Sequence, residues 1–254
     1  MLLTIDIGNS HIVWGVFERQ ILKGSWRLST DSTKTSDEYG ILFLSLLSTL
    51  GLDASCIHGT ILSSVVPPVT PILEQMVRTF FHHSPLVVTH EFPLGIQVCY
   101  ANPQEIGTDR LVNAVAAYDR YRTNLTIVDF GTATTFCAVT HEGKYLGGAI
   151  APGLKSSVEA LHSQTAKLPI VELVCPKQVI GTDTTSSMQA GLIFGYTGLV
   201  DELVTRIQRE VGKGMVLATG GLASVIAPIS RTIQEVRPFL TLEGLELLYR
   251  RLYP

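Results

Sequence analysis

Leu125-Thr126-Ile127-Val128-Asp129-Phe130-Gly131-Thr132-Ala133-Thr134-Thr135-Phe136 has the pattern of two strands joined by a tight turn. An apolar run with β-branched members leads to the carboxylate of Asp129, and Gly131 opens the turn before a second β-rich run. This pattern is typical of a buried strand that ends in a hairpin and presents polar groups there.

The same pattern stands at the start of the chain, where an apolar run leads to Asp6 and the chain turns at Gly8. The two copies align at a shift of 123 residues (129 − 6), which also aligns the polar segments 18–20 and 141–143. A repeat this long exceeds a solenoid unit, so it predicts two similar halves, each opening with a three-stranded meander. We place the halves at residues 1–120 and 121–254, with a cleft between them.

Each turn has the chemistry of a phosphate site. A glycine lacks the Cβ that would keep a ligand from the backbone, so the amides of residues 9–10 and 132–134 can approach phosphate oxygens. The hydroxyls of Ser10, Thr132 and Thr134 add donors. An aspartate repels phosphate unless a cation lies between them, so the pair implies a metal-bound polyphosphate. One Asp-x-Gly is usually only a hairpin, but two copies in register favour a functional site.

The size, charge and cysteine content of the chain exclude several classes of protein. The chain has 254 residues, 46% hydrophobic and 16% charged, which is enough apolar material for a large core. The net charge of −3 and the absence of a basic stripe argue against nucleic-acid binding. The four cysteines have no paired spacing, so we expect reduced, buried thiols in a cytoplasmic protein. We expect neither a signal peptide nor a membrane span, and the histidines show no metal-ligand spacing.

The first half reads as an α/β unit. After the meander, residues 36–50 predict a helix, 57–66 a buried strand, 67–81 a second helix and 86–89 a short strand. This β-β-β-α-β-α-β order predicts a mixed sheet flanked by helices.

The segment from Tyr100 to Arg122 carries a second constellation. Thr108 is suited to cap a helix whose first turn holds Asp109 and Arg110. The helix dipole favours an ionised aspartate at this place, which suits a group that accepts a proton. The plainer alternative is a stabilising acid that pairs with a neighbouring arginine.

The second half offers three further features. Residues 181–187 open a long helix to about residue 211, and its hydroxyl-rich start, including Thr184, is either a ligand-facing edge or an ample cap. Glycines at 191, 195 and 198 leave one side of that helix without side chains, which predicts that another element packs closely there, inside the monomer or across a dimer. A strand over 215–218 ends at Gly220-Gly221, which either admits a flat base or makes an ordinary strand-to-helix turn.

Taken in order, these motifs resemble those of the type III pantothenate kinases, in the superfamily of acetate and sugar kinases, Hsp70 and actin. The resemblance rests on Asp6-x-Gly8-Asn9-Ser10, Gly107-Thr108-Asp109-Arg110 with Asn113-Ala114, Asp129-x-Gly131-Thr132-Ala133-Thr134 and Thr219-Gly220-Gly221. It covers essentially the whole chain and implies an actin-like, ribonuclease H-like fold. Ser10 stands where threonine is frequent in that family, and it keeps the hydroxyl.

The resemblance implies phosphorylation of pantothenate by ATP with Mg²⁺, the first step of coenzyme A biosynthesis. It makes Asp109 the proton acceptor, Asp6 a Mg²⁺-linked residue, and Asp129 the ligand of a monovalent cation, K⁺ or NH₄⁺; from the residues alone, Asp129 would fit Mg²⁺ as well. It also implies a homodimer and places the glycine pair on the adenosine side. The implied ATP contacts are Asp6, Ile7, Gly8, Asn9, Ser10, His11, Ile12, Val13 and Thr132. The implied pantothenate contacts are Tyr100, Gly107, Thr108, Asp109, Arg110 and Thr184, with Arg110 on the substrate carboxylate.

Two other classes remain open. A nucleotide-dependent regulatory protein on the same scaffold would not need Asp109 and Arg110 beside a small-molecule pocket; some proteins that resemble this family were first described as accessory factors for transcription. A sugar or acetate kinase would share the phosphate turns but should be larger and carry another acceptor site.

Overall fold

The structure is a computed structural model that describes residues 1–253 and divides into two compact units. The first unit comprises Met1–Gly95, Asn102–Ala116 and Thr241–Pro254. The second unit comprises Ile96–Ala101 and Ala117–Leu240.

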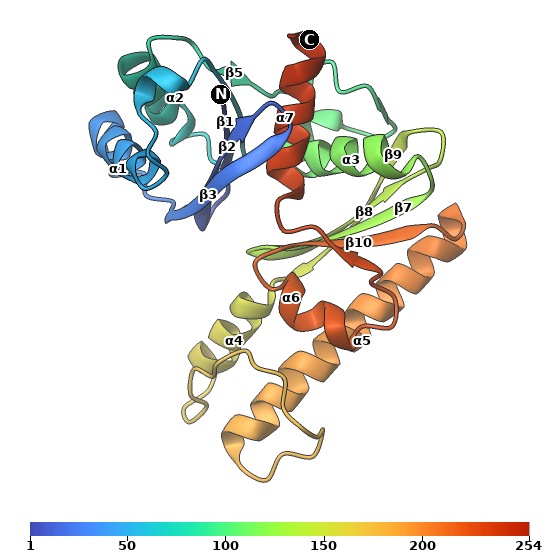
Figure 1. The fold of residues 1–254 in the computed structure, drawn as a ribbon. Helices are drawn as coiled ribbons and strands as arrows, with labels where there is room; N and C mark the ends of the chain where they lie inside the picture. The colour runs from blue at the N-terminus through green and yellow to red at the C-terminus, as the bar shows by residue number, and fades with distance from the viewer. Residues whose placement is uncertain (254) are drawn as a thin grey trace. The chain divides into compact units, whose positions relative to one another are not determined.

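The first unit is a mixed five-stranded sheet between helices (Figure 1). The sheet order is β3-β2-β1-β4-β5; β1 runs antiparallel to β2 and parallel to β4. Its strands are β1 (Leu2–Ile7), β2 (His11–Glu18), β3 (Ile21–Ser29), β4 (Gly59–Ser64) and β5 (Leu86–Val87). Its helices are α1 (Ser36–Ser48), α2 (Thr70–Phe81), the first part of α3 (Thr108–Tyr121) and α7 (Leu240–Leu252), with 3₁₀ turns at Ala54–Cys56 and Pro103–Glu105.

Helices α1 and α2 share one core with a face of this sheet. Trp14 of β2 and Phe43 of α1 are fully buried, and their rings meet edge to face with centroids 4.4 Å apart. Truncating such a ring costs about 3–5 kcal/mol, so this contact holds α1 on the sheet. The helix starts at a capping box, in which Thr35 and Glu38 each bond the backbone N–H of the other.

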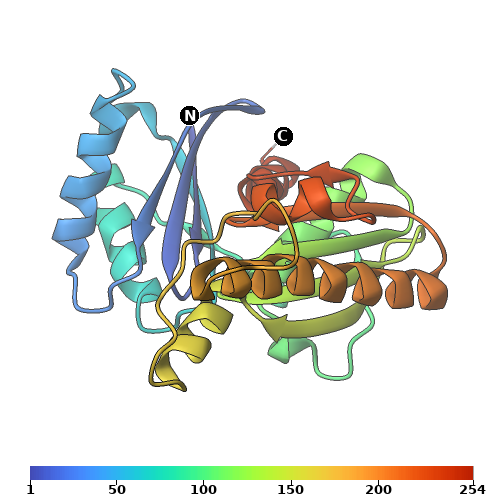
Figure 2. The same ribbon diagram turned by 90° about the horizontal axis from the view of Figure 1, so that it is seen from below.

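The second unit repeats this topology around its own sheet, in the order β11-β10-β7-β8-β9-β6. Its strands are β6 (Gln97–Val98), β7 (Leu125–Phe130), β8 (Ala133–Val139), β9 (Lys144–Pro152), β10 (Met215–Gly220) and β11 (Glu235–Val236). Its helices are α4 (Leu154–Ser163), α5 (Thr184–Val211) and α6 (Ala223–Ile226), followed by a 3₁₀ turn at Ala227–Ile229. Helices α4, α5 and α6 form one core with a sheet face, and Figure 2 shows α5 running along the strands.

The predicted halves differ from the compact units in three places, of which the smallest is that residues 117–120 fall in the second unit. Strand β6 pairs with β9 and so belongs to the second unit. Helix α7 belongs to the first unit, because two strand glycines leave room for it: a Cβ at Gly15 would lie 2.8 Å from Leu242, and one at Gly59 would collide with the Tyr249 ring. Both contacts join residues distant in sequence, which local patterns do not reveal.

The two meanders confirm the predicted repeat and show where it slips. Asp6 pairs with Val13 and Asp129 with Thr135, so the shift is 123 in the first strands and 122 in the second (135 − 13). The third strands return to 123, since β3 and β9 begin at residues 21 and 144. Even the β-bulge repeats, after Val16 in β2 and after Ala138 in β8. The second phosphate turn is therefore one residue shorter than the first.

The predicted elements between the meanders are confirmed, with ends that differ by a few residues. Thr108 is the first residue of α3 instead of its cap, and its hydroxyl donates to the Ser64 carbonyl at 3.2 Å. Among residues 1–253, no helix combines the length and apolar character that crossing a bilayer requires.

Asp201, in the middle of α5, is a buried carboxylate that holds the loop before β11. It accepts hydrogen bonds from the hydroxyls of Ser230 and Thr232 at 2.6 and 2.8 Å and from the backbone N–H of Arg231 at 3.1 Å. Burial alone raises the pKa of Asp201, but these bonds together outweigh it and the pKa lies below its usual value.

We predict that Asp201→Asn lowers the free energy of unfolding by about 1–3 kcal/mol at neutral pH, measured by denaturant titration. Because the folded pKa is depressed, the carboxylate stabilises the protein above the unfolded pKa of about 3.9 and loses this effect as pH falls through the folded value. The difference between parent and variant should therefore shrink in acid. Glu202→Gln, at the neighbouring exposed ion pair with Arg206, is the control and should change little.

Candidate functional site

The first predicted phosphate turn lies between β1 and β2 and is held by Thr30, the residue that follows β3. The N–H of Gly8 donates to the His11 carbonyl at 3.0 Å and closes the turn. Thr30 donates its hydroxyl to the Gly8 carbonyl at 2.6 Å and its N–H to the Ser10 carbonyl at 3.1 Å. Asn9 and Ser10 are exposed. Thr30 was missed in the sequence, since nothing near it marks a site.

Two of the predicted ATP contacts in this segment have side chains that cannot face a ligand. Ile7 and Ile12 are fully buried in the core shared with α1 and α2. Only their backbone groups could take part, whereas His11 and Val13 remain partly exposed. The turn can therefore offer a ligand its backbone groups, while the flanking isoleucine side chains pack in the core.

Asp6 is oriented by a neighbouring strand. It lies beside Ser63 in the parallel ladder of β1 and β4, and the Ser63 hydroxyl donates to Asp6 Oδ1 at 2.8 Å. Ser63 is fully buried, so this bond is shielded from water. Its role was not predicted, although a serine pair at a buried strand's end is a signal that could have suggested it.

The start of α3 belongs to the same unit and is tied to the same strand end, since Thr108 bonds the Ser64 carbonyl. Asp109 follows, and its Oδ1 accepts the N–H of Arg110 at 2.8 Å. Gly107 is required beside it, because a Cβ there would collide with Asp109 Oδ1 and approach Val65 to 3.2 Å. The structure therefore groups Asp6, the first turn and Asp109 around the ends of β1 and β4.

The environment of Asp109 differs from the expected one. Burial raises the pKa of its carboxyl, while the backbone N–H and charge of Arg110 oppose that shift without cancelling it. Asp109 keeps part of its surface exposed. A carboxylate with a raised pKa is a stronger base than an ordinary aspartate, which suits proton acceptance. Arg110 itself is only 8% exposed, so little of the guanidinium faces solvent.

The second predicted phosphate turn lies between β7 and β8 in the other unit. The N–H of Gly131 donates to the Ala133 carbonyl at 3.2 Å, and Thr132 is exposed. Ser156 of α4 donates to the Thr132 carbonyl at 3.1 Å. Gly153 lies directly against this turn, where a Cβ would collide with the Thr132 carbonyl. The prediction of a ligand-facing hydroxyl is wrong for Thr134, whose side chain is fully buried.

Asp129 stands in a row of oxygen-bearing residues across three strands. Thr135 of β8 and Thr219 of β10 are its partners in the two ladders, so all three side chains leave the same sheet face. Thr135 Oγ1 is buried and, among residues 1–253, has no hydrogen-bond partner. An orphaned buried oxygen beside a carboxylate fits a cation ligand.

Gly220 has a structural reason of its own. Its φ is +87°, and a Cβ would lie 2.5 Å from Asp129 Oδ1 and 2.6 Å from the Phe130 carbonyl. The strand-to-helix turn therefore explains this glycine without a nucleotide, and its adenosine-side role stays a prediction.

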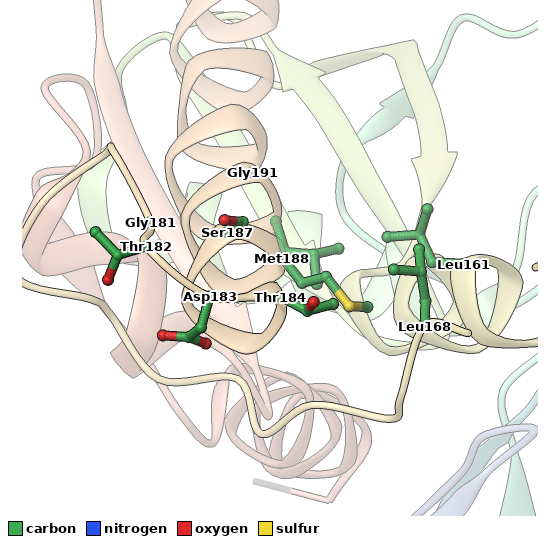
Figure 3. Close-up of a pocket in the computed structure, with 10 residues that line it drawn as sticks. Leu161, Leu168, Gly181, Thr182, Asp183, Thr184, Ser187, Met188 and Gly191 are labelled. Carbon is green, nitrogen blue, oxygen red and sulfur yellow. The ribbon is translucent and has the colours of Figure 1, made fainter.

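Two predicted pantothenate contacts, Tyr100 and Thr184, lie in the second unit. The Tyr100 ring lies on Gly147 of β9, where a Cβ would come within 2.8 Å of it. Thr184 is the first residue of α5 and lines a cavity of about 710 Å³ with Asp183, Ser187 and Met188 (Figure 3). Asp183 caps the helix by accepting the N–H of Ser186 at 2.9 Å, which confirms the cap, while the ligand-facing role of Thr184 stays a prediction.

The structure thus divides the predicted residues between the two units. Asp6, the first turn and residues 107–110 belong to the first unit. Asp129 and Thr132 with Tyr100 and Thr184 belong to the other unit. Residues 1–253 contain no cluster of three or more histidine, cysteine or acidic side chains that could hold a metal ion alone.

Comparisons with known structures define the class of the fold. A Campylobacter jejuni protein assigned to the Baf family of transcriptional activators gives a TM-score of 0.59 at 17% identity, covering 99% of this chain and 98% of its own. The activator of 2-hydroxyisocaproyl-CoA dehydratase from Clostridium difficile, with bound ADPNP, gives 0.54 at 12% identity, covering 98% and 93%. The ROK hexokinase from Thermus thermophilus gives 0.50 at 11%, covering 99% of each chain. The fold is therefore that of the actin-like and sugar kinase proteins, as expected.

Sequence comparisons identify the particular family. The model of the type III pantothenate kinase family matches residues 2–206. Relatives of that name from Pelobacter propionicus and Geobacter sulfurreducens are 53% and 52% identical over 252 residues, each covering 99% of both chains. The chain belongs to the type III pantothenate kinase family, which confirms the resemblance drawn from the motifs.

We predict that Asp109→Asn retains or raises stability at neutral pH, because the desolvated charge is removed while an amide oxygen can still accept the Arg110 N–H. An acid with a raised folded pKa carries no penalty below its unfolded pKa and destabilises the fold as pH rises through the folded value. The variant's advantage in thermal midpoint, measured from pH 4 to pH 8, should therefore grow above the unfolded pKa of about 3.9 and level off above the folded value. A lower midpoint for the variant throughout that range would contradict the burial argument.

Proposed function

We propose that this protein transfers the terminal phosphoryl group of ATP to the primary hydroxyl of pantothenate, giving 4'-phosphopantothenate, the first step of coenzyme A biosynthesis. Membership of the type III pantothenate kinase family over the full chain supports this activity. The observation in the structure that carries it is Asp109, a partly exposed base with a raised pKa, tied to the same strand end as the Asp6 turn.

The first unit supplies the residues for proton transfer and phosphate orientation. Asp109 accepts the proton of the attacking hydroxyl, which is most of what a carboxylate must do in phosphoryl transfer. The amides of Gly8 to Ser10 hold phosphate oxygens, and the Ser63 hydroxyl fixes the Asp6 carboxylate by a hydrogen bond. Mg²⁺ bound with ATP neutralises phosphate charge, and the carboxylate of Asp6 and nearby hydroxyls fit it as hard oxygen donors. Arg110 pairs with the pantothenate carboxylate.

The second unit supplies the other phosphate contact and the monovalent cation site. Exposed Thr132 contacts ATP, and Asp129 with the Thr135 hydroxyl holds K⁺ or NH₄⁺. Gly220 and Gly221 lie on the adenosine side. Tyr100 and Thr184 contact pantothenate, and the cavity beside Thr184 offers apolar walls.

The protein acts as a cytoplasmic homodimer. Gly191, Gly195 and Gly198 are exposed on α5, and a Cβ at any of them would meet nothing within 4 Å in the described chain. Packing inside the monomer therefore does not account for the small residues on this side of α5, which supports a second copy of the chain as the partner of this side. The four cysteines are all free thiols, in keeping with a reducing compartment, but the expectation that they are buried is correct for Cys137 alone.

A regulatory role is the competing function. The Campylobacter protein's assignment to a family of transcriptional activators suggests this role, but a similarity at 17% identity supports only the fold. ATP binding without turnover of pantothenate by the purified parent, with Mg²⁺ and K⁺ present, would favour regulation over catalysis.

We predict that Asp109→Asn lowers kcat by at least about a hundredfold, since general-base catalysis contributes about 10²–10⁴. In the parent, kcat should fall in acid with an apparent pKa above the usual 3.8 of aspartate, because burial raises the pKa of Asp109. A coupled assay of ADP release across pH measures both. Asp119→Asn, later on the same helix and in a partly exposed ion pair with Arg122, is the matched control and should keep full turnover. Full activity of Asp109→Asn would remove this residue from the mechanism.

We predict that Thr135→Val raises the K⁺ concentration for half-maximal activity, because the variant keeps the shape of the side chain and loses one oxygen ligand. Titration of activity with KCl at constant ionic strength measures the change. Thr126→Val, on the neighbouring strand and with a buried side chain, is the control. An unchanged K⁺ dependence would place the cation elsewhere.

A further inference from the structure

Tyr196 of α5 stands out among the buried polar side chains of the second unit. It is 8% exposed, and its hydroxyl lies 2.5 Å from Thr134 Oγ1 and 2.7 Å from the Pro152 carbonyl. Thr134 is the second residue of β8, the strand that leaves the second phosphate turn, and Pro152 ends the strand beside it. One side chain therefore bonds both strands at the end where the turn is made.

A count of protons fixes the direction of the two hydrogen bonds. A tyrosine hydroxyl has one proton, and the Pro152 carbonyl can only accept, so Tyr196 donates to Pro152. The short contact with Thr134 is then satisfied when Thr134 donates to Tyr196. Burial raises the pKa of Tyr196, so the hydroxyl keeps its proton at working pH. The Thr134 proton is directed at α5 and away from any ligand.

The rest of the turn is attached to the same two strands. The Phe130 and Thr134 backbones pair across the hairpin, which leaves residues 131–133 as its tip. Ser156 and Gly153 contact the Thr132 carbonyl from the chain that follows Pro152. A shift of β8 against β9 would therefore move the amides of the turn.

We propose that Tyr196 is a positioning residue for ATP: its hydroxyl locks Thr134 to Pro152 and so holds the 131–133 turn in the geometry that receives phosphate. The inference rests on the proposed function, because it takes this turn to be an ATP contact. Tyr196 itself touches no substrate. Its effect should fall on ATP and spare pantothenate.

The test compares Tyr196→Phe, Thr134→Val and the double variant in steady-state assays. Each single variant should raise the KM for ATP by about threefold to tenfold, the loss expected for one hydrogen bond, with the KM for pantothenate within about twofold of the parent. The KM for ATP of the double variant should not exceed the higher of the two single-variant values, because the two hydroxyls act as one pair. Thr134→Ser keeps the hydroxyl and should restore the parent KM for ATP.

Two controls separate positioning from general loss of stability. Thr197→Val removes a buried hydroxyl from the next residue of α5, where it bonds only its own helix through the Ile193 carbonyl. Tyr118→Phe removes a tyrosine hydroxyl that bonds the His141 carbonyl. Both should leave the KM for ATP unchanged. An unchanged KM for ATP in folded Tyr196→Phe, an equal rise in both KM values, or additive effects in the double variant would each overturn the proposal.

Equilibrium titration with ATP distinguishes failure of this inference from failure of the proposed function. If the parent binds ATP but does not phosphorylate pantothenate, weaker ATP binding by Tyr196→Phe still supports the positioning role. If the parent binds no ATP, the turn is not a nucleotide site and the inference falls with it.

Discussion

The site depends on one pairing that both units share. In each unit, the first strand of the meander runs parallel to the strand that follows the meander in sequence. β1 pairs with β4, and β7 pairs with β10. Because parallel strands end at the same edge of a sheet, this pairing sets a second strand end beside each glycine turn. Ser63 reaches Asp6 in one unit, and Thr219 stands beside Asp129 in the other. An antiparallel neighbour would have placed a strand start there instead.

The two turns share this plan but are stabilised differently. The first is held by Thr30, from the end of β3, which bonds the turn directly. The second is one residue shorter and is held by helices α4 and α5. Ser156 of α4 bonds the Thr132 carbonyl, and Tyr196 of α5 bonds Thr134. A duplicated fold thus keeps the backbone geometry that phosphate needs while the supporting side chains differ between the copies.

Much of this could be predicted from local pattern. The apolar runs, the paired Asp-x-Gly turns and the helix start at residue 108 depend on neighbours in sequence, and the structure confirms them as elements. The anchors Ser63, Thr30 and Tyr196 could not be predicted, because each acts on a residue 22 to 62 positions away. The burial of Thr134 was missed for the same reason: its neighbours suggest a ligand-facing hydroxyl, and α5 covers it.

The sequence by itself determined the α/β class, the two similar halves, the turns and the family, because these depend on periodicity and on motifs read in order. Only the tertiary structure decided the environment of the groups. Asp109 looks like an ordinary ionised residue in a first helical turn, yet burial raises its pKa. Gly107 and Gly220 look like ligand cradles, yet each makes room for an aspartate of the same unit. Desolvation and close approach are properties of packed neighbours from distant segments, and no local pattern contains them.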